Sequence, residues 1–190
     1  MWGRGGLLLR SHGYTLIELL FVGALAAILA GFTAPAVHAA LTRSRTIAAA
    51  RYLGSRMAMT RTYAVTRSAN VAIRFNETGS DATFQMFADG NGNGVRNADI
   101  TAGVDVPLDQ PVALSALFPD VTIAAADGDD PIRIGSTNLL SFTPLGTATP
   151  GSIFIRGGDG LQLALRVVGS TGRTRLLRYD ATSKSWVASF

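Results

Sequence analysis

The hydrophobic residues of this chain gather in one N-terminal run. The stretch from Gly13 to Val37 is almost wholly apolar, and from Leu19 to Ala40 it contains no Asp, Glu, Lys or Arg. A helix of about 20 apolar residues can cross a bilayer core. Glu18 interrupts the start of the run, and a carboxylate in lipid is costly and usually functional. The alternative is a glutamate whose carboxylate reaches the membrane surface.

A helical pattern continues beyond this run. Alanine and arginine, both strong helix formers, dominate the sequence after Ala40. Apolar residues recur there at close to helical spacing: Ile47, Ala50, Leu53, Met57 and Tyr63 or Ala64. The pattern predicts one long helix from about Tyr14 to about Arg67, with Pro35 as the site of a kink. Its second half is expected to pack an apolar stripe on a sheet.

The rest of the chain consists of short β-like runs separated by Gly, Pro, Asn and Asp. No second long helical pattern and no internal repeat occur, and Asp89–Pro111 reads as a linker. We therefore predict an α+β fold, with a long N-terminal helix packed on antiparallel β-sheet. The predicted strands are Val71–Phe75, Thr83–Phe87, Val112–Phe118, Val121–Ala125, Ile132–Ile134, Leu139–Phe142, Ser152–Arg156, Leu161–Val168, Arg173–Tyr179 and Ser185–Val187.

Composition argues against an enzyme. At 190 residues the chain suits one domain plus an appendage, and it has no cysteine. Disulfides, thiolate metal sites and thiol nucleophiles are therefore excluded. Both histidines, His12 and His38, lie in the N-terminal segment, so no histidine serves the globular part. No phosphate-binding loop or zinc-protease motif occurs, and the acids Asp127, Asp129 and Asp130 read as a solvated turn.

Basic residues exceed acidic ones and give a formal net charge of +4. Lys184 is the only lysine; the other basic residues are arginines, a bias that either genome composition or bidentate contact with phosphate or carboxylate explains. Six arginines lie on the second half of the long helix. They form either a solvated polar face or a nucleic-acid surface. The six residues are Arg43, Arg45, Arg51, Arg56, Arg61 and Arg67.

A strand-turn-strand pattern near the C-terminus brings further arginines together. Leu161–Val168 alternates apolar and polar residues, and Gly169-Ser170-Thr171-Gly172 forms the turn. If Gly169 pairs with Gly172, Arg166 lies opposite Arg175, and Arg173 shares their outer face. Like charges in this arrangement destabilise a sheet. We expect nearby acids such as Asp159 or Asp180, a partner subunit or a phosphate to offset the repulsion.

One loop has the start of a calcium-binding pattern. In Asp89-Gly90-Asn91-Gly92-Asn93-Gly94, oxygen-bearing side chains occupy alternate positions and glycine follows at the sixth. Asp99 lies one residue before the position of the usual glutamate, and no flanking helices are predicted. The expected ligands of a weak calcium site are Asp89, Asn91, Asn93 and Asp99. The alternative is a glycine-rich turn, which needs no metal.

The sequence Gly13-Tyr14-Thr15-Leu16-Ile17-Glu18-Leu19-Leu20 resembles the type III signal of type IV pilins and type II secretion pseudopilins. The resemblance implies that a prepilin peptidase cleaves between Gly13 and Tyr14 and methylates the new N-terminus on Tyr14. Tyr14 replaces the phenylalanine usual in that family. Residues 1–13 are then the leader, 14–41 the transmembrane and filament-core part, and 42–190 the periplasmic globular domain.

The resemblance also implies a role for Glu18, which becomes the fifth mature residue and guides assembly. Its carboxylate can pair with the N-terminal ammonium of a neighbouring subunit. Arg4 and Arg10 precede the apolar run and place the N-terminus in the cytoplasm of a single-pass inner-membrane protein. A conventional secretory signal cleaved near Ala39 fits less well, because the run is too long and contains Glu18.

Two further segments resemble the GspH/FimT family of H-type pseudopilins and FimT-like minor pilins. They are Phe142-Thr143-Pro144-Leu145-Gly146, followed by Gly151-Ser152-Ile153, and Gly172-Arg173-Thr174-Arg175. The resemblance implies a type IV pilin-like fold, no cofactor and a minor pseudopilin near the tip of the periplasmic pseudopilus of type II secretion. Its partners are then other major and minor pseudopilins, the prepilin peptidase and the inner-membrane secretion platform. The alternative is a FimT-like minor pilin that binds DNA through Arg166, Arg173 and Arg175 during natural transformation.

Overall fold

The computed structural model describes residues 13–79, 81–125 and 129–188, and of residues 32–36 it describes the backbone alone. The chain divides into two compact units, Met1–Ala39 and Ala40–Phe190. Residues 1–12 of the predicted leader, the side chain of Pro35 and Asp127 lie outside the described residues. The predictions for them, including the kink, stay predictions.

Helix α1 spans Leu16–Arg67, close to the predicted range. In the first unit its described apolar side chains, such as Ile17, Phe21 and Leu25, are exposed. The sequence predicts a membrane-spanning helix from Leu19 to Ala40. Within the described part of the chain, which omits the side chains of 32–36, no helix is long and apolar enough to cross a membrane.

The second unit holds the other half of α1, whose apolar stripe is buried as predicted. Ala50, Leu53, Met57 and Ala64 are fully buried, and Ile47 packs against the same core. The helix ends where Ser68 adopts a positive φ of 50°. Its N–H donates to the carbonyl of Val65, and the next N–H donates to the carbonyl of Ala64. These bonds satisfy two of the last four carbonyls of the helix.

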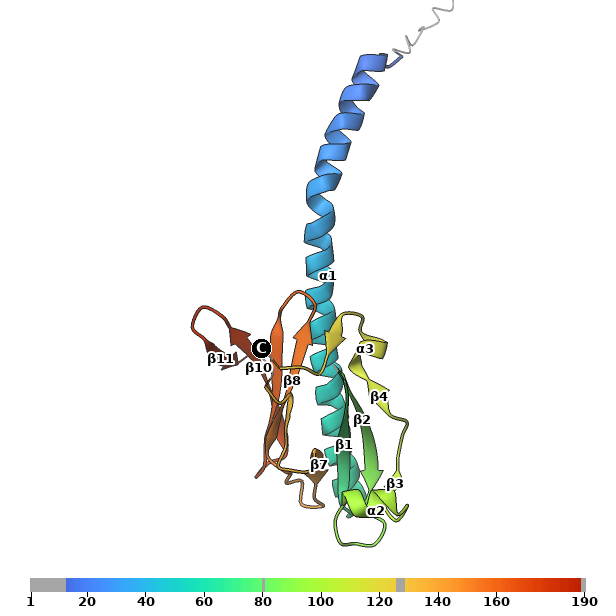
Figure 1. Cartoon of the computed structure of the whole chain (residues 1–190), viewed down its shortest axis with the longest axis vertical. Helices are drawn as coiled ribbons and strands as arrows, with labels where there is room; N and C mark the ends of the chain where they lie inside the picture. Colours follow the sequence, from blue (N-terminus) through green and yellow to red (C-terminus); the bar gives the residue numbers. More distant parts are fainter. Residues whose placement is uncertain (1–12, 80, 126–128, 189–190) are drawn as a thin grey trace, which may run out of the picture. The chain divides into compact units, whose positions relative to one another are not determined.

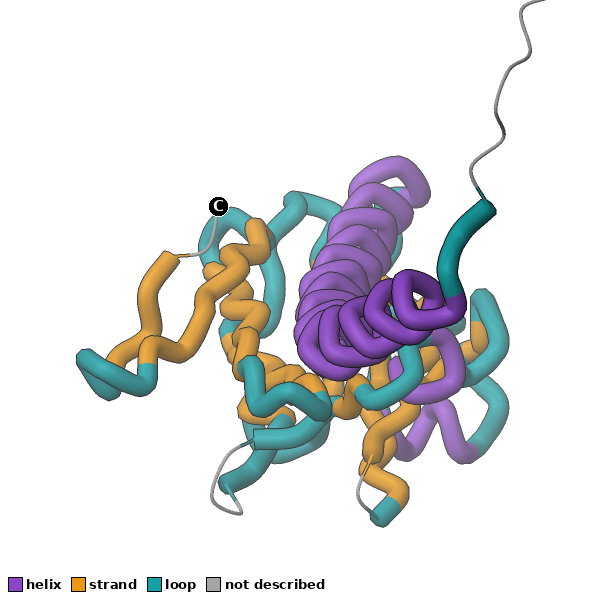
Figure 2. The backbone as a smooth tube through the Cα atoms, turned by 90° about the horizontal axis from the view of Figure 1, so that it is seen from above, coloured by secondary structure: helices purple, strands orange, loops and turns teal. Residues whose placement is uncertain are grey.

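Two antiparallel sheets lie alongside this half of α1 (Figures 1 and 2). The first sheet has the order β3-β2-β1-β7, and β4 also pairs with β2. Its strands are β1 (Val71–Thr78), β2 (Asp81–Ala88), β3 (Val106–Pro107), β4 (Val112–Ala113) and β7 (Leu139–Phe142).

The second sheet has the order β11-β10-β9-β8-β5, and β6 pairs with β8. Its strands are β5 (Val121–Thr122), β6 (Ile132–Arg133), β8 (Gly151–Gly157), β9 (Gln162–Val168), β10 (Arg173–Asp180) and β11 (Ser185–Ala188). One buried cluster joins α1 to both sheets, with Met57 from the helix, Phe84 from the first sheet and Leu165 from the second. The predicted α+β architecture, a long helix packed on antiparallel sheet, is confirmed.

Two predictions about the connections were wrong. Val112–Phe118 is a strand only over Val112–Ala113, and helix α3 follows at Leu114–Leu117. A short apolar run fits one helical turn as well as a strand, and here the side chain of Leu114 is buried. The segment Asp89–Pro111 is not an unstructured linker, because it contains helix α2 (Asn97–Thr101) and strand β3.

Candidate functional site

The predicted cleavage site lies just before the start of α1. Gly13 and Tyr14 are exposed and not helical. The N–H of Glu18 donates to the Thr15 hydroxyl at 3.3 Å, and the N–H of Leu19 donates to the Thr15 carbonyl. Thr15 is therefore the N-cap, and Thr15-Leu16-Ile17-Glu18 has the spacing of a capping box, a signal that the sequence analysis did not use. Glu18 also lies in the first turn of α1, where a negative charge interacts favourably with the helix dipole and stabilises the helix.

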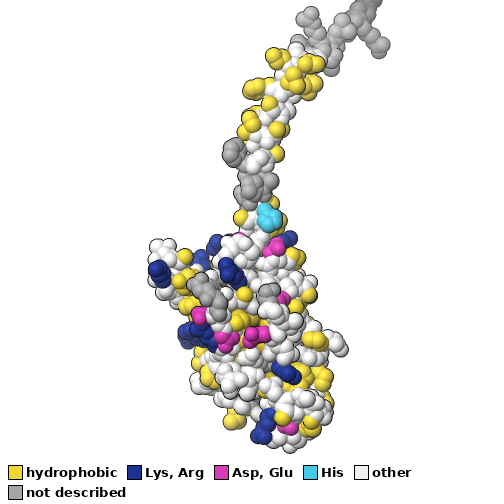
Figure 3. All heavy atoms as spheres, in the orientation of Figure 1, with side chains coloured by type: hydrophobic (Ala, Val, Ile, Leu, Met, Phe, Trp, Pro, Cys, Tyr) yellow, Lys and Arg dark blue, Asp and Glu magenta, His cyan; other side chains and the backbone are white. Residues whose placement is uncertain are grey.

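The arginine row on the second sheet has the predicted register. Arg175 lies opposite Arg166, and Arg173 lies opposite Val168. On its other side Arg166 faces Ser152, and its Nε donates to the Ser152 hydroxyl at 3.4 Å. All three arginines are exposed. Figure 3 shows Lys and Arg side chains on the side of the globular unit where Figure 1 places β10 and β11.

The acids expected to offset this charge do not pair with it. Asp159 accepts the N–H of Leu161 in its own turn. Asp180 accepts the Ser183 hydroxyl and the Thr182 N–H, which hold the pKa of Asp180 below its usual value. Among the described residues, ion pairs join only Arg45 to Asp120, Arg56 to Asp109 and Arg133 to Asp129. A partner subunit and a phosphate remain as the predicted ways to neutralise the row.

An aromatic cluster lies on the same outer face, and the sequence analysis did not single it out. Tyr179 shares the face of Arg175 by alternation along β10, and it lies opposite Trp186. The Trp186 ring centroid is 5.3 Å from those of Tyr179 and Phe154. The guanidinium of Arg133 stacks 5.0 Å above Phe154. The alternation of side chains along β8 could have placed Phe154 on this face, because Phe154 lies two residues from both Ser152 and Arg156.

The two C-terminal sequence motifs meet at one junction beside α1. Arg61 of α1 donates from Nε to the Gly146 carbonyl at 3.0 Å. Gly146 and Gly172 both have positive φ, which favours glycine. A Cβ on Gly172 would lie 2.3 Å from the Gly146 carbonyl oxygen and 3.1 Å from Cδ of Arg61. The junction therefore ties the helix to the β7–β8 connection and to the β9–β10 hairpin.

The predicted calcium loop is closed by its own hydrogen bonds. The Asp89 carboxylate accepts the backbone N–H groups of Asn91, Gly92 and Gly94 and the side-chain amide of Asn70. Burial raises the pKa of Asp89, but the four hydrogen bonds together lower it by more than burial raises it. The net pKa therefore lies below the usual value. Asp89 is therefore an ionised anchor for the turn.

Asp105, which the sequence analysis missed, anchors the other end of this loop. Its side chain is only 1% exposed, and its two oxygens accept the N–H groups of Gly90 and Arg96. Among the described residues, no three His, Cys, Asp or Glu side chains come together as metal ligands. Helix α2 follows the loop, although no flanking helix was predicted. Calcium binding by Asp89, Asn91, Asn93 and Asp99 stays a prediction.

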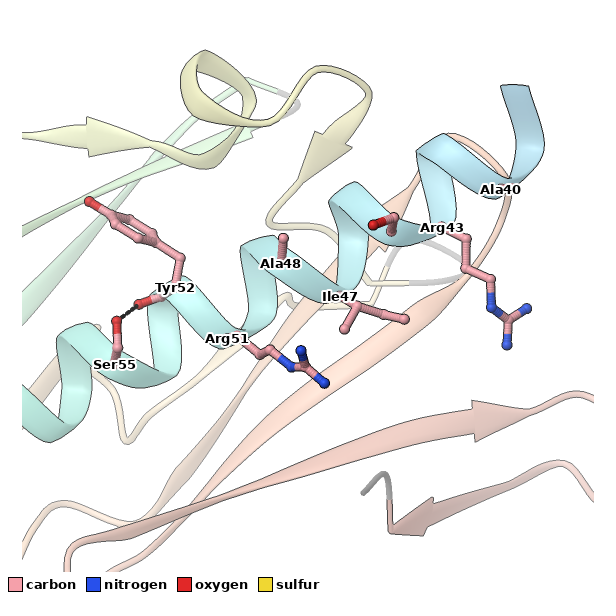
Figure 4. Close-up of a pocket in the computed structure, with 8 residues that line it drawn as sticks. Ala40, Arg43, Ile47, Ala48, Arg51, Tyr52 and Ser55 are labelled. Atoms are coloured by element: carbon pink, nitrogen blue, oxygen red, sulfur yellow. Dashed lines mark hydrogen bonds between the residues drawn. The ribbon is translucent and has the colours of Figure 1, made fainter. Parts of the chain in front are cut away.

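The arginines of α1 do not form one uniform solvated face. Arg56 makes an ion pair with Asp109, Arg45 lies 3.7 Å from Asp120, and Arg67 stacks on Tyr63. Arg43 and Arg51 are exposed, and within the described structure neither has a charged partner. Figure 4 shows both leaving α1 on the same side as Ile47.

One comparison with known proteins, a match to a family model, fits this architecture. A long N-terminal helix packed on antiparallel sheets is consistent with a type IV pilin-like fold. Residues 49–172, well over half of the chain, match the family described as type II transport protein GspH. The chain therefore belongs to the GspH family, a pseudopilin family of type II secretion and a structural component of that apparatus. No curated protein and no solved structure matched the chain.

Proposed function

We propose that this protein is a minor pseudopilin that assembles near the tip of the periplasmic pseudopilus and helps to drive folded proteins across the outer membrane. The family match over residues 49–172 carries the proposal. The signal around Gly13 lies outside the matched region and supports it independently. The role is structural and non-enzymatic, and the partners are other pseudopilins and the inner-membrane secretion platform. Before assembly, residues 14–41 hold the precursor in the inner membrane, with the globular domain in the periplasm.

Processing by a prepilin peptidase is the first test of this proposal. Replacing Gly13 by valine is expected to abolish cleavage. The bulk of the branched side chain would then lie directly beside the bond to Tyr14, where the peptidase requires a small residue. The shift in mass corresponding to residues 1–13 is followed by immunoblot, and mass spectrometry identifies a methylated Tyr14. Gly6→Val, in the same leader, is the control and should be processed normally. A mature protein that begins near Ala39 would contradict the proposal.

Secretion itself is tested with Glu18. A deletion strain carrying Glu18→Gln should fail to restore protein export to the culture medium, because glutamine keeps the capping-box geometry but loses the charge. Glu77→Gln removes an exposed carboxylate of the globular unit and serves as the control. Exported protein in the medium is measured beside the amount of pseudopilin in the cells. Wild-type export by Glu18→Gln would mean that the carboxylate has no role in assembly beyond the helix cap.

A second candidate function is DNA binding by a FimT-like minor pilin. Arg166, Arg173 and Arg175 favour it, because the described residues leave them without acidic partners. We expect Arg173→Gln/Arg175→Gln to weaken DNA binding and to reduce the slope of log affinity against log salt by about 2. The single variant Lys184→Gln is the control for general loss of charge. If the wild-type chain binds no DNA at low salt, the secretion function stands alone.

A further inference from the structure

A groove of about 410 Å³ lies between the second half of α1 and the first half of β10. On the helix it is lined by small residues, Ala50, Gly54 and Ala58, which leave the space open. On the sheet its wall includes Leu165 and Leu176. The groove therefore combines an apolar floor with enough space for several side chains of a bound polypeptide.

The charged residues that line this groove are all arginines: Arg51, Arg61 and Arg173. Arg61 is held in place by its 3.0 Å hydrogen bond to the Gly146 carbonyl. Arg51 and Arg173 have no acidic partner among the described residues. Because no acidic residue lines the groove, its charge favours an anionic occupant.

The groove also runs beside an edge of β10 that has no partner strand among the described residues. The described residues of β11 pair with Leu177–Asp180 of β10. On that side of β10, no described residue pairs with Arg173–Leu176, a stretch of four residues or about 13 Å. Such an edge is a template for another extended chain.

We propose that this groove binds an extended, acidic segment of a partner polypeptide. The segment adds as a strand to this edge of β10 and places its carboxylates against Arg51 and Arg173. Main-chain pairing supplies affinity in this mode of recognition, and alternate side chains supply specificity. Guanidinium groups bind carboxylates with paired, charge-assisted hydrogen bonds. Nucleic acid and inorganic phosphate can use the arginines but not the backbone edge, and so a polypeptide accounts for both features. The inference goes beyond assembly through α1.

The test uses the full-length chain in detergent micelles and short fluorescent peptides with capped ends. One peptide alternates Val and Glu, and a second alternates Val and Lys. We expect the acidic peptide to bind about tenfold more tightly by fluorescence anisotropy. Methylating the backbone nitrogens of the acidic peptide should abolish binding. Arg51→Gln and Arg173→Gln should each weaken it several-fold, whereas Arg156→Gln, an exposed arginine outside the groove, should leave it unchanged.

Three results would overturn the proposal. The first is equal affinity for the acidic and basic peptides. The second is unchanged binding to Arg51→Gln and Arg173→Gln variants whose circular dichroism and thermal unfolding match the wild type. The third is undiminished binding of the backbone-methylated peptide or equal binding of a short oligothymidylate, because either result would mean that the groove binds polyanions without using the backbone edge of β10. None of these results bears on processing at Gly13 or on export, so the inference and the proposed function fail separately.

Discussion

Replacing Gly172 by alanine is expected to lower the free energy of unfolding by about 3 kcal/mol. Part of the loss is conformational, because Gly172 has a φ of 59°, where an L-residue with a Cβ costs about 1 kcal/mol. The larger part is steric. The new Cβ would lie 2.3 Å from the Gly146 carbonyl oxygen, a backbone atom that cannot rotate away as a side chain can.

Gly160→Ala separates these two contributions. Gly160 has a φ of 82°, but nothing lies within 4 Å of the place its Cβ would take. We expect this control to lose only the conformational part, about 1 kcal/mol. Urea unfolding of residues 40–190, followed by the fluorescence of Trp186, the only tryptophan of that unit, measures both variants. Equal losses would mean that the contact at the junction contributes nothing.

The second large effect is expected at the ion pair between Arg56 and Asp109. The two side chains are only 18% and 19% exposed, and Asp109 also accepts the N–H of Met86 at 2.8 Å. Asp109→Asn keeps an acceptor for Met86 but leaves the guanidinium of Arg56 partly buried without its counter-charge. We expect a loss of about 2 kcal/mol, below the cost at a fully buried pair because some solvent reaches this one.

The control is Asp120→Asn, which removes the exposed partner of Arg45. Those side chains are 40% and 53% exposed and 3.7 Å apart, so the loss should stay below about 0.5 kcal/mol. Asparagine also tolerates the positive φ of Asp120. The same urea measurement applies. A loss at Asp109→Asn no greater than at Asp120→Asn would show that the Arg56 pair does not stabilise the fold.

The sequence was sufficient to predict those parts of the fold that depend on the local pattern of residues. The β9–β10 register followed from a four-residue turn between alternating strands, and the structure places Arg166 opposite Arg175 as predicted. Helix α1 and the buried positions Leu53 and Met57 followed from helical spacing. The short run at Val112–Phe118 failed because too few residues repeat to separate a strand from a helical turn.

Contacts between residues far apart in the chain could not be predicted. Arg61 and Gly146 are separated by 85 positions, and nothing in the local spacing of either indicates that they meet. The same holds for Arg56 and Asp109, because Arg56 belonged to a row of arginines that all suited a solvated face. By contrast, the N-cap at Thr15 could have been identified from the Thr-x-x-Glu spacing alone.

The unpaired arginine row has a consequence for how this protein can diverge. Arg166, Arg173 and Arg175 point away from the buried cluster and take part in no ion pair among the described residues. Substituting them therefore breaks no ion pair among the described residues and relieves the repulsion between neighbouring like charges. Among the same residues, the internal contact that is lost is the 3.4 Å hydrogen bond from Arg166 to Ser152 on the exposed face. Selection for a new partner can therefore change the residues on this face while the buried cluster beneath it stays the same. Related proteins with the same fold can thus use the outer face of the second sheet to bind different partners.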